Sequence, residues 1–501
     1  MYKNQYFICD NPVKIKWDDY DTKLFNGFHI YHSTFLDVTI VEDINSQLCT
    51  LGYIIDPFSP QKNNEQILED LLKTCSNADE LIINLQKYSG RYVVLYKNDR
   101  DFIMISDACS LRQIYYTFFD GQAIFTSSPK MFLDVFDYKW LIGDLKKSVI
   151  DEKKFAEKEF MYGDEGLDDR LMKVLPNHYL NMTKREVLRT PLKIGHFDCE
   201  DDVINYASDI LRGSIAAINN RYKTVQAITA GLDSRTLLAA SKSVSDSIEY
   251  YTFSTALTEK STDYIIPGKL ANSLKIKNYK SILPGEVNQE FREFYSNHHI
   301  FPRINHTLRN IQYHYYNNQN KINVNGNGGE IVRNYYGNIK INDVSDLYCI
   351  FDIPENRYVM AQIDKWYRDA KGFSEEYSIP ITDLFYWENR MGNWFALAPL
   401  EQDIAIEMFC PFNNKELLLA IFTIDSSRRS APNYTFFKDL IYNMWSETLT
   451  QPINPENIIK RLITKMKIEI KKRMNDRTIS LLRKVIKHCP FWPLENIEKR
   501  I

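Results

Sequence analysis

The stretch "AITAGLDSRTLLAASK", residues 227–242, predicts the end of a strand, a tight turn and a helix. The turn, Thr229–Ser234, holds small residues, one carboxylate and hydroxyl groups. Backbone N–H groups at a helix start have no partner, and the helix dipole favours an anion, so such a turn suits phosphate. Asp233 repels phosphate by itself but suits Mg²⁺ that bridges phosphate oxygens. The alternative is an ordinary turn with Asp233 or Ser234 as a helix cap.

The order of elements around this turn predicts a parallel α/β sheet. A helical stretch, Val203–Ile218, precedes a strand at Thr224–Ile228, and a second strand follows at Ile248–Thr255. Strand, helix and strand at this spacing form a βαβ unit. Lys321–Gly329 predicts a third strand that runs into a glycine-rich loop, and the chain after it is mostly helical. We expect this domain to occupy residues 196–455.

The preceding residues predict a different class of domain, α+β, over 1–195. Short segments rich in β-branched and aromatic residues alternate with turn residues, which is typical of antiparallel sheets. A helix that starts near Asn64 interrupts them, and its apolar residues share one face. The segments that we expect to be strands are "FHIYHS", "VTIVED", "CTLGYIIDP", "GRYVVLYKN", "DFIMISD", "IYYTFF", "QAIFTSS" and, after a turn, the end of "VLPNHYLNM". Residues 456–501 are expected to form a basic helical tail.

Composition excludes several classes of protein. A net charge of -3 gives no overall attraction to nucleic acid, and no apolar run is long enough to span a bilayer. The eight cysteines are scattered, without C-x-x-C or zinc-ligand spacing, which favours thiols in a reducing cytosol. The N-terminus lacks the apolar core of a signal peptide. We therefore expect a cytoplasmic protein.

The turn at 229–234 resembles the pyrophosphate loop S-G-G-x-D-S of ATP pyrophosphatases, and later segments resemble the asparagine synthetase branch. "NGNGGEIVRNYYG" (325–337) is similar to that family's S-G-x-G-x-D-E motif, with Glu330 on its Asp and Ile331 on its Glu. "ENRMGNW" (388–394) resembles the D-R-M helix, and "CPFNNKELL" (410–418) resembles the V-P-F-L-D segment. "YTFFKDLI" (434–441) puts Lys438 on the family's catalytic lysine.

The resemblance implies ATP and Mg²⁺ as cofactors. Asp233 and Glu330 would hold the metal, Glu330 and Lys438 would be catalytic, and Lys438 would neutralise charge on the phosphoryl group. Arg333 and Arg390 are interpreted as structural ion-pair partners or phosphate contacts. The nucleotide would be held at the two loops, at the end of the second strand and at an acidic position beyond it, by Thr229, Ala230, Gly231, Leu232, Asp233, Ser234, Thr252, Phe253, Ser254, Asp263, Gly326, Gly328 and Gly329.

The N-terminal half resembles the family's glutaminase domain, an N-terminal-nucleophile sandwich. Asp107, Arg112, Tyr115 and Tyr116 fall on its "ARDxxGxxPLYY" segment, Ser127–Lys130 on its "SExKA" segment, and "VLPNHYL" on its "LPPGHYL" strand. The family's nucleophile is a cysteine directly after Met, where this chain has Tyr2. Cys9 would take that place only after removal of eight residues. We therefore expect a scaffold without amidase chemistry.

The expected function is ATP-dependent amide formation: a carboxylate is adenylated and passed to ammonia or an amine, with release of AMP and pyrophosphate. The carboxylate would belong to a small molecule or be linked to a peptide or glycan, nucleic acid is not an expected partner, and a homodimer is left open. In related β-lactam synthetases a Tyr/Glu pair helps deprotonate the amine; Glu388 and Glu401 are candidate counterparts, and the alternative for each is a helix-surface or ion-paired carboxylate. Three alternatives stay open: a glutamine-hydrolysing asparagine synthase, a tRNA-modifying pyrophosphatase that the basic tail permits, and a nucleotide-binding pseudoenzyme, which Ala230, Asn327 and Ile331 suggest because they depart from the motifs.

Overall fold

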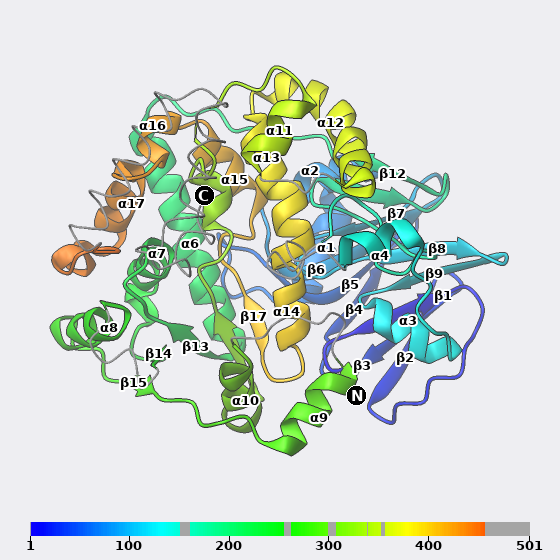
Figure 1. Ribbon diagram of the computed structural model, residues 1–501, viewed down its shortest axis with the longest axis horizontal. Coiled ribbons are helices and arrows are strands. Elements are labelled where there is room, and N and C mark those ends of the chain that lie inside the picture. Colours follow the sequence, from blue (N-terminus) through cyan, green and yellow to red (C-terminus); the bar gives the residue numbers. More distant parts are fainter. Residues whose placement is uncertain are drawn as a thin grey trace, which may run out of the picture. The chain divides into compact units, whose positions relative to one another are not determined.

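Two antiparallel sheets of six strands each form the N-terminal half of the chain (Figure 1). The first sheet has the order β10 (Met172–Lys173), β8 (Tyr115–Phe119), β9 (Gln122–Thr126), β1 (Tyr6–Cys9), β3 (Phe28–Ser33) and β2 (Tyr20–Phe25). The second has the order β12 (Glu186–Arg189), β11 (His178–Asn181), β7 (Phe102–Ser106), β6 (Ser89–Asn98), β5 (Ser46–Ile55) and β4 (Val38–Glu42). The strands at all the positions predicted above are present, so the local sequence pattern located this half of the fold.

The two sheets pack face to face and are covered by helices outside. Buried side chains from both sheets, among them Ile8 and Leu95, share one core. The outer face of the second sheet packs against α1 (Asn64–Thr74) and α2 (Ala78–Leu85), and that of the first against α3 (Pro129–Phe136). Because both faces of the central strands are covered, β1 is buried along its whole length instead of alternating. The predicted α+β sandwich is therefore confirmed as four layers, helix, sheet, sheet and helix.

A parallel sheet forms the centre of the C-terminal half. Its strand order is β15 (Tyr279–Ile282), β14 (Glu249–Phe253), β13 (Lys223–Ala227), β16 (Lys321–Val324) and β17 (Glu407–Phe409), and each neighbouring pair is parallel. One face packs against α6 (Glu200–Arg221), α7 (Leu232–Ala240) and α17 (Thr435–Trp445). The other face meets α10 (Leu308–Asn317), whose His314 ring lies edge-on to Tyr251. The predicted parallel α/β arrangement is thus present.

Helix α6 packs against both halves of the chain. Its buried residues recur at every third or fourth position and face strands of both halves. A Cβ on Gly213 of α6 would lie 1.8 Å from the backbone oxygen of Pro57, so only glycine allows this approach. The remaining helices are α4 (Asp144–Ile150), η1 (Lys242–Val244), α8 (Thr262–Ser273), α9 (Gln289–His298), η2 (Gly329–Val332), α11 (Val344–Ile350), α12 (Arg357–Tyr377), α13 (Ile381–Phe385), the π-helix η3 (Tyr386–Phe395), α14 (Leu397–Gln402), α15 (Lys415–Phe422), α16 (Ser426–Arg429) and η4 (Ser446–Thr450).

Polar contacts also cross between the halves. The buried Arg91 donates to both carboxylate oxygens of Asp403, at 2.5 and 2.8 Å. Arg112 pairs with Glu407 of β17, and the Tyr53 hydroxyl donates to a backbone oxygen of the same strand. Buried charges are costly unless they are paired, so these contacts hold the sandwich and the parallel sheet in one arrangement.

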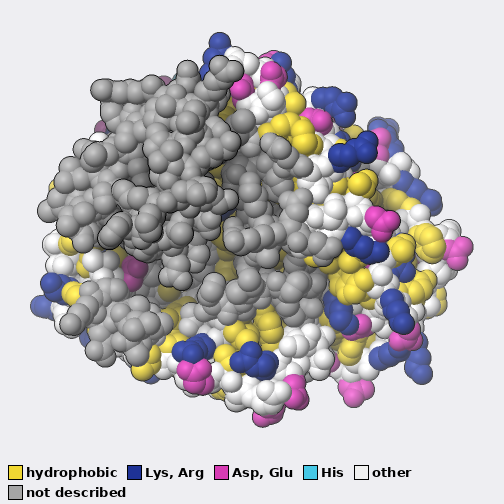
Figure 2. Space-filling view, viewed as in Figure 1, with side chains coloured by type: hydrophobic (Ala, Val, Ile, Leu, Met, Phe, Trp, Pro, Cys, Tyr) yellow, Lys and Arg dark blue, Asp and Glu magenta, His cyan; other side chains and the backbone are white. Residues whose placement is uncertain are grey.

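This computed structural model describes residues 2–150, 161–254, 262–298, 307–337, 339–351 and 356–455. The chain divides into two compact units, Met1–Ile453 and Asn454–Ile501, and every element named here lies in the first. The predicted boundary near residue 195 falls within that unit, and the predicted tail at 456–501 lies outside the described residues. Among the described helices, none is long and apolar enough to cross a bilayer. Basic and acidic side chains are interspersed where Figure 2 shows the described surface.

Candidate functional site

The loops after β13 and β16 lie side by side at the carboxyl ends of two adjacent strands. From β13 the chain proceeds outward to β14 and β15, then returns to the other side of β13 for β16 and β17. The strand order therefore reverses between β13 and β16. Open parallel sheets bind ligands in the crevice at such a switch point, outside the carboxyl ends of the strands. Both loops identified in the sequence lie at this point.

The loop after β13 closes on its own hydroxyl groups. The side-chain oxygens of Thr229 and Ser234 are 2.7 Å apart, and Thr229 Oγ1 accepts a hydrogen bond from the Gly231 amide at 3.0 Å. Gly231 is the N-cap of α7, whose first backbone bond runs from the Arg235 amide to the Gly231 oxygen. The amides at positions 232–234 precede that bond, so the helix leaves them available. Together with the helix dipole they favour an anion.

The second loop, Asn325–Glu330, contacts the first turn of α7. A Cβ on Gly326 would lie 2.9 Å from Asp233 Cβ, and one on Gly329 would lie 2.6 Å from Asp233 Oδ1. Gly328 has a φ of +97°, in the left-handed region that favours glycine. The three predicted glycines therefore permit the close approach of the two loops, and any side chain there would separate them.

The contact between the loops brings two carboxylates and one guanidinium together. Arg333 Nη2 lies 3.2 Å from Asp233 Oδ2 and 3.3 Å from Glu330 Oε1. The guanidinium also lies over the ring of Tyr434, 5.7 Å from its centre. The two side chains expected to hold a metal are thus neighbours, and Arg333 is the ion-pair partner of both. Its position three residues after Glu330 on a helical turn is the only sequence signal for this role.

The electrostatics of the cluster follow from burial. Burial first and the Glu330 carboxylate second raise the pKa of Asp233, Arg333 opposes them, and the net result is a pKa of about 7. Burial alone would lower the pKa of Arg333, but the carboxylates of Asp233 and Glu330 more than offset this and raise it. A carboxylate whose pKa lies near neutrality gains a proton or a cation at little cost, which is typical of functional sites.

The donor set at the cluster suits a hard divalent cation. Asp233 Oδ1 is buried and has no hydrogen-bond partner within the described part of the chain. Mg²⁺ is commonly held by one or two carboxylates together with substrate phosphates and water, and the Asp233–Glu330 pair supplies two carboxylates. The described residues contain no group of three or more His, Cys, Asp or Glu side chains with metal-ligand geometry. The residues present therefore fit Mg²⁺ that arrives with a phosphate ligand.

The residues predicted to hold the adenine lie at the end of β14, beside the first loop. The Thr252 hydroxyl donates to the Ile228 backbone oxygen at 2.6 Å, which ties this strand end to the start of the loop. Ser254 is buried and bonds by its amide and hydroxyl to the end of β15. The Phe253 ring packs edge-on against His314 of α10. These side chains are therefore already engaged within the fold, and contact with an adenine ring stays a prediction for this strand end.

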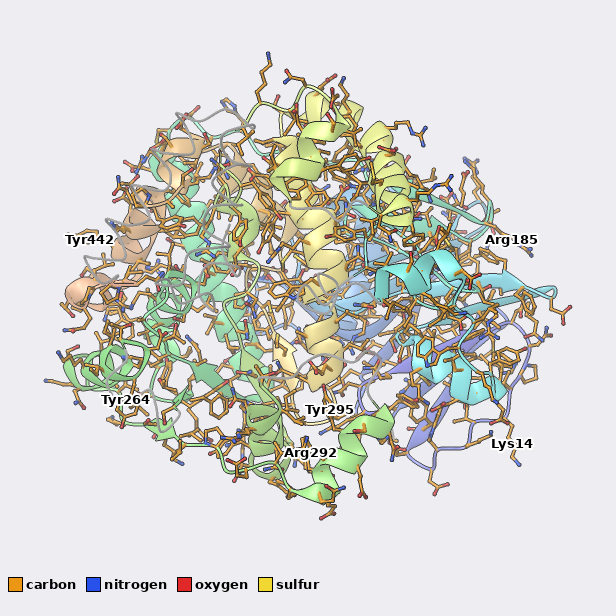
Figure 3. All side chains as sticks on the ribbon, viewed as in Figure 1. Lys14, Arg185, Tyr264, Arg292, Tyr295 and Tyr442 are labelled. Carbon is orange, nitrogen blue, oxygen red and sulfur yellow. The ribbon has the colours of Figure 1, made fainter. Side chains whose placement is uncertain are left out.

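Asp263 meets the loop directly. The amide of Ala230 donates to Asp263 Oδ1 at 3.3 Å. Asp263 lies in the first turn of α8 and is exposed. Its neighbour Tyr264 is labelled on α8 in Figure 3. A carboxylate thus already contacts an amide of the loop, as an anionic ligand would. The acidic residue expected near the nucleotide therefore lies at the candidate site, where it contacts the loop at 229–234.

Lys438 lies on the exposed side of α17. Tyr442, four residues later and on the same helix face, is 68% exposed and is labelled at the outer side of α17 in Figure 3. The buried face of the helix carries Phe437 and Leu440 instead. No hydrogen bond or ion pair links the ammonium to Asp233 or Glu330 in the described regions. Tyr434, one turn before Lys438 on the same helix face, has its ring under the Arg333 guanidinium. The catalytic role of Lys438 stays a prediction.

The two glutamates considered as bases have structural partners. Glu388 is fully buried and accepts from Arg189 at 2.6 and 3.0 Å, from Trp366 Nε1 at 2.7 Å and from Asn177 at 3.2 Å. Glu401 accepts a hydrogen bond from the hydroxyl of Tyr295, on α9. Arg390 is packed among the rings of Tyr335, Tyr386 and Trp394. Glu388 is thus a structural ion-pair residue, and the cluster around Asp233 includes neither glutamate.

The N-terminal half contains no exposed thiol among its described residues. The hydroxyl of Tyr2 bonds to Asp134, so this side chain is buried against α3. Cys9 is the last residue of β1, paired on both sides, and burial raises the pKa of its thiol to about 12. Cys49, Cys75 and Cys109 are buried as well. Removal of residues 1–8 would delete most of a central strand, so Cys9 is a structural residue.

The segment that resembles the glutaminase motif contacts residues of the C-terminal half. Asp107 accepts from the amide of Arg112 at 2.9 Å and from the Asn413 side chain at 2.9 Å. The guanidinium of Arg112 pairs with Glu407, in the parallel sheet. Tyr115 is buried, Tyr116 is half-buried, and the buried Ser127 bonds to the backbone of β1. Asp107 and Arg112 therefore link the two halves, whereas Ser127 bonds within the sandwich.

Comparison with known proteins finds no matching family model and no matching curated sequence. The allosteric regulatory enzyme of purine biosynthesis is a similar solved structure, with 12% identity and a TM-score of 0.24 over 45% of this chain and 54% of its own. Glutamine phosphoribosylpyrophosphate amidotransferase from B. subtilis, complexed with ADP and GMP, has 10% identity and a TM-score of 0.25 over 66% of this chain and 71% of its own. The match spans about half of the first enzyme, and values this low support no inference about the site.

Proposed function

We propose that this chain is an ATP-dependent ligase of the asparagine synthetase type, which activates a carboxylate as its adenylate and passes it to ammonia or an amine. The observation that supports this most directly is the contact between the loops after β13 and β16. There the free amides of α7 and the carboxylates of Asp233 and Glu330 adjoin at the switch point of a parallel sheet.

In this proposal the phosphates of ATP bind the amides at the start of α7 and the hydroxyls of Thr229 and Ser234. Asp233 and Glu330 would hold Mg²⁺, which supplies charge stabilisation for the pyrophosphate leaving group. A substrate carboxylate oxygen attacks the α-phosphorus, and the bond to the β-phosphate breaks. The amine nitrogen then attacks the acyl carbon, loses a proton, and AMP leaves with the former bridging oxygen.

The acyl acceptor is proposed to be ammonia or a primary amine that does not derive from glutamine hydrolysed by this chain. This rests on the burial of Cys9, Cys49, Cys75 and Cys109 in the described residues of the sandwich. A buried thiol in apolar surroundings is a poor nucleophile, since the thiolate is the reactive form. Incubation of the purified chain with glutamine, followed by a glutamate assay, checks this. Turnover above that of heat-inactivated protein would contradict it.

A second function, binding of a nucleotide without catalysis, is favoured by one observation. Arg333 already pairs with both carboxylates of the cluster. A guanidinium fixed between Asp233 and Glu330 competes with a metal ion for the same oxygens. This alternative retains affinity for the nucleotide and predicts no pyrophosphate release with any carboxylate.

Calorimetry with ATP and MgCl₂ tests the shared first step. Wild type is expected to bind ATP in the presence of Mg²⁺, and Asp233→Ala is expected to lose at least tenfold in affinity, since one charged contact to a bound group is worth about 1.5–3 kcal/mol. Asp209→Ala, which removes an exposed aspartate of α6, is the matched control. Equal affinity in Asp233→Ala and wild type would contradict a nucleotide site at these loops.

A pyrophosphate-release screen over carboxylic acids and amines separates the two functions. Release with wild type supports the ligase, and tight ATP binding without release from any acid supports the non-catalytic alternative. Lys438→Ala then tests the remaining motif assignment: loss of a catalytic donor typically costs about 10²–10³ in rate. A full rate in Lys438→Ala would remove this lysine from the mechanism while leaving the nucleotide site intact.

A further inference from the structure

A cavity lies among β10, β11, β12 and α12, away from the loops after β13 and β16. Its volume is about 370 Å³, within the range of small-molecule sites. Strands from the antiparallel sandwich form one wall and α12 forms the other, as the neighbouring positions of β12 and α12 in Figure 1 indicate. None of the residues at the phosphate loops line it, so it is a separate site.

Lys173 is a buried cation in this cavity without an anionic partner. Its side chain is almost fully buried, and Nζ donates to the Gly392 backbone oxygen at 2.9 Å and to Asn393 Oδ1 at 2.6 Å. Both acceptors are neutral, and an ammonium has three donors. No carboxylate lies within ion-pair distance of Nζ in the described part of the chain. Nζ also lies 5.8 Å from the centre of the Tyr115 ring. When the amine is protonated, its third N–H and its charge are left for a ligand anion.

Gln362 provides a hydrogen-bond acceptor in the same cavity. Its side chain is 6% exposed, and its amide nitrogen donates to Glu165 Oε1 at 2.7 Å. Its oxygen, Oε1, is buried and has no hydrogen-bond partner among the residues that the structure describes. That oxygen faces the backbone of Gly163, where a Cβ would lie only 2.3 Å away. A buried acceptor without a donor costs about 1–3 kcal/mol, so a ligand N–H at this point recovers that loss.

Lys173 and Gln362 are connected through one short loop. The amide of Lys173 donates to the Asp164 backbone oxygen at 2.7 Å, and Asp164 directly follows Gly163. The Asp164 carboxylate also lines the cavity, where Lys365 of α12 holds it at 2.9 Å. An open cationic donor, an unmet acceptor and a carboxylate are thus adjacent. The ligand that complements all three has one anionic group and one N–H-bearing cationic group close together.

The other strong cation of the cavity is not available to a ligand. Arg189 donates to both oxygens of Glu388 and to Asp369, which occupies its planar fork. Apolar side chains complete the wall, and Leu175, Val187 and Trp366 are among them. The cavity therefore provides a polar end at Lys173 and Gln362 and apolar surface for a side chain beyond it.

We propose that this cavity binds a free α-amino acid, with the ligand carboxylate on Lys173 Nζ and the ligand ammonium on Gln362 Oε1 and the Asp164 carboxylate. Because the binding groups come from the sandwich and from α12, occupancy links the two halves of the chain. The proposal does not depend on the nucleotide site, and it holds whether or not the chain forms amides.

The burial of Lys173 provides a readout specific to this geometry. Burial lowers the pKa of Lys173 to about 7, with Asp164 opposing the shift. At pH 8 the free protein then holds mostly the neutral amine, and a carboxylate on Nζ requires the ammonium, so binding takes up about one proton. The other ionisable groups around the cavity are Asp164, Glu165, His178, Arg189, Lys365 and Asp369. His178 is the histidine among them, so it needs a control.

Calorimetry of the full chain at pH 8, with the common L-amino acids tested one at a time in buffers of different ionisation enthalpy, measures both affinity and proton uptake. At least one amino acid is expected to bind with uptake of about one proton. Lys173→Met should weaken binding at least tenfold, and Gln362→Leu should weaken it about tenfold. Lys173→Arg should keep binding but lose the uptake, because arginine stays charged. His178→Asn should keep both.

Several results would overturn the proposal. No heat of binding with any amino acid, or unchanged affinity in Lys173→Met, excludes the site. Equal affinity for the matching acid without its amino group excludes the role of Gln362 and Asp164. Proton uptake that persists in Lys173→Arg and disappears in His178→Asn assigns the proton elsewhere and contradicts the placement of the carboxylate. Circular dichroism establishes whether each variant is folded. If Lys173→Met does not fold, Lys173→Arg still decides the test.

Discussion

Replacement of Asp233 by asparagine should change how the stability of the protein depends on pH. Asp233 touches the second loop through Gly326 and Gly329 and pairs with Arg333 beside Glu330. Its pKa of about 7 in the folded protein lies above the unfolded value of 3.8, mainly because of burial. The folded protein therefore binds this proton more tightly than the unfolded chain. The resulting contribution to the free energy of unfolding is fully present below pH 4 and is lost as the pH rises through 7.

The magnitude follows from the size of this shift. Each pH unit between the two pKa values changes the free energy of unfolding by about 1.4 kcal/mol. Between pH 5 and pH 8 the free energy of unfolding of the wild type should therefore fall by about 2–3 kcal/mol. The Asp233→Asn variant should not show this fall, because asparagine is neutral in both the folded and the unfolded state. The carboxylate is only 19% exposed, so solvent screening reduces this modestly. Asp233→Asn should thus be relatively more stable at pH 8 than at pH 5.

Urea unfolding at pH 5, 6, 7 and 8 measures this difference as a shift in the midpoint at constant slope. The matched control is Asp209→Asn, which removes an exposed carboxylate of α6 and should give a difference that is flat with pH. A difference between Asp233→Asn and wild type that stays constant from pH 5 to pH 8 would refute the reasoning. A difference that falls as the pH rises would mean that Arg333 outweighs burial and that the carboxylate is stabilised as an anion.

Three further substitutions test the packing and charge of the fold. Gly329→Ala inserts a Cβ 2.6 Å from Asp233 Oδ1 and should weaken Mg²⁺–ATP binding about tenfold by calorimetry, whereas Gly372→Ala, in open space on α12, should leave it unchanged. Arg333→Met removes a competing cation and should tighten binding of MgCl₂ alone about tenfold; unchanged binding would mean that the guanidinium does not compete. Arg91→Met leaves a buried carboxylate unpaired and should lower the free energy of unfolding by about 3–5 kcal/mol in urea, and a loss below 1 kcal/mol would contradict the buried pair.

Local sequence pattern was sufficient for most of the central strands and for the position of the loops. The β-branched and aromatic runs that became β5, β6 and β7 carry their signal within a few residues, and turn residues bound them. The turn at 229–234 was located because a strand and a helix flank it directly. Such features depend on neighbours in the chain, so they are readable without a structure.

Features set by tertiary contact were not readable in the same way. Strand β2 has an exposed and largely polar sequence, and β17 is three residues long, so each becomes a strand only because a neighbour pairs with it. The lysine and the glutamine of the amino-acid cavity, Lys173 and Gln362, are far apart in the chain and have no common motif.

The charge of the cluster limits what either proposed function allows. The cluster holds two carboxylates and one guanidinium, so once Asp233 is ionised, above pH 7, a nucleotide that arrives without a divalent cation meets a net negative site. Mg²⁺ reverses the sign of the cluster and makes it attractive to phosphate. Binding of ATP should therefore depend on the metal whether or not catalysis follows. It follows that metal dependence alone does not distinguish the ligase from the non-catalytic alternative, and that pyrophosphate release with a defined carboxylate is the measurement that does.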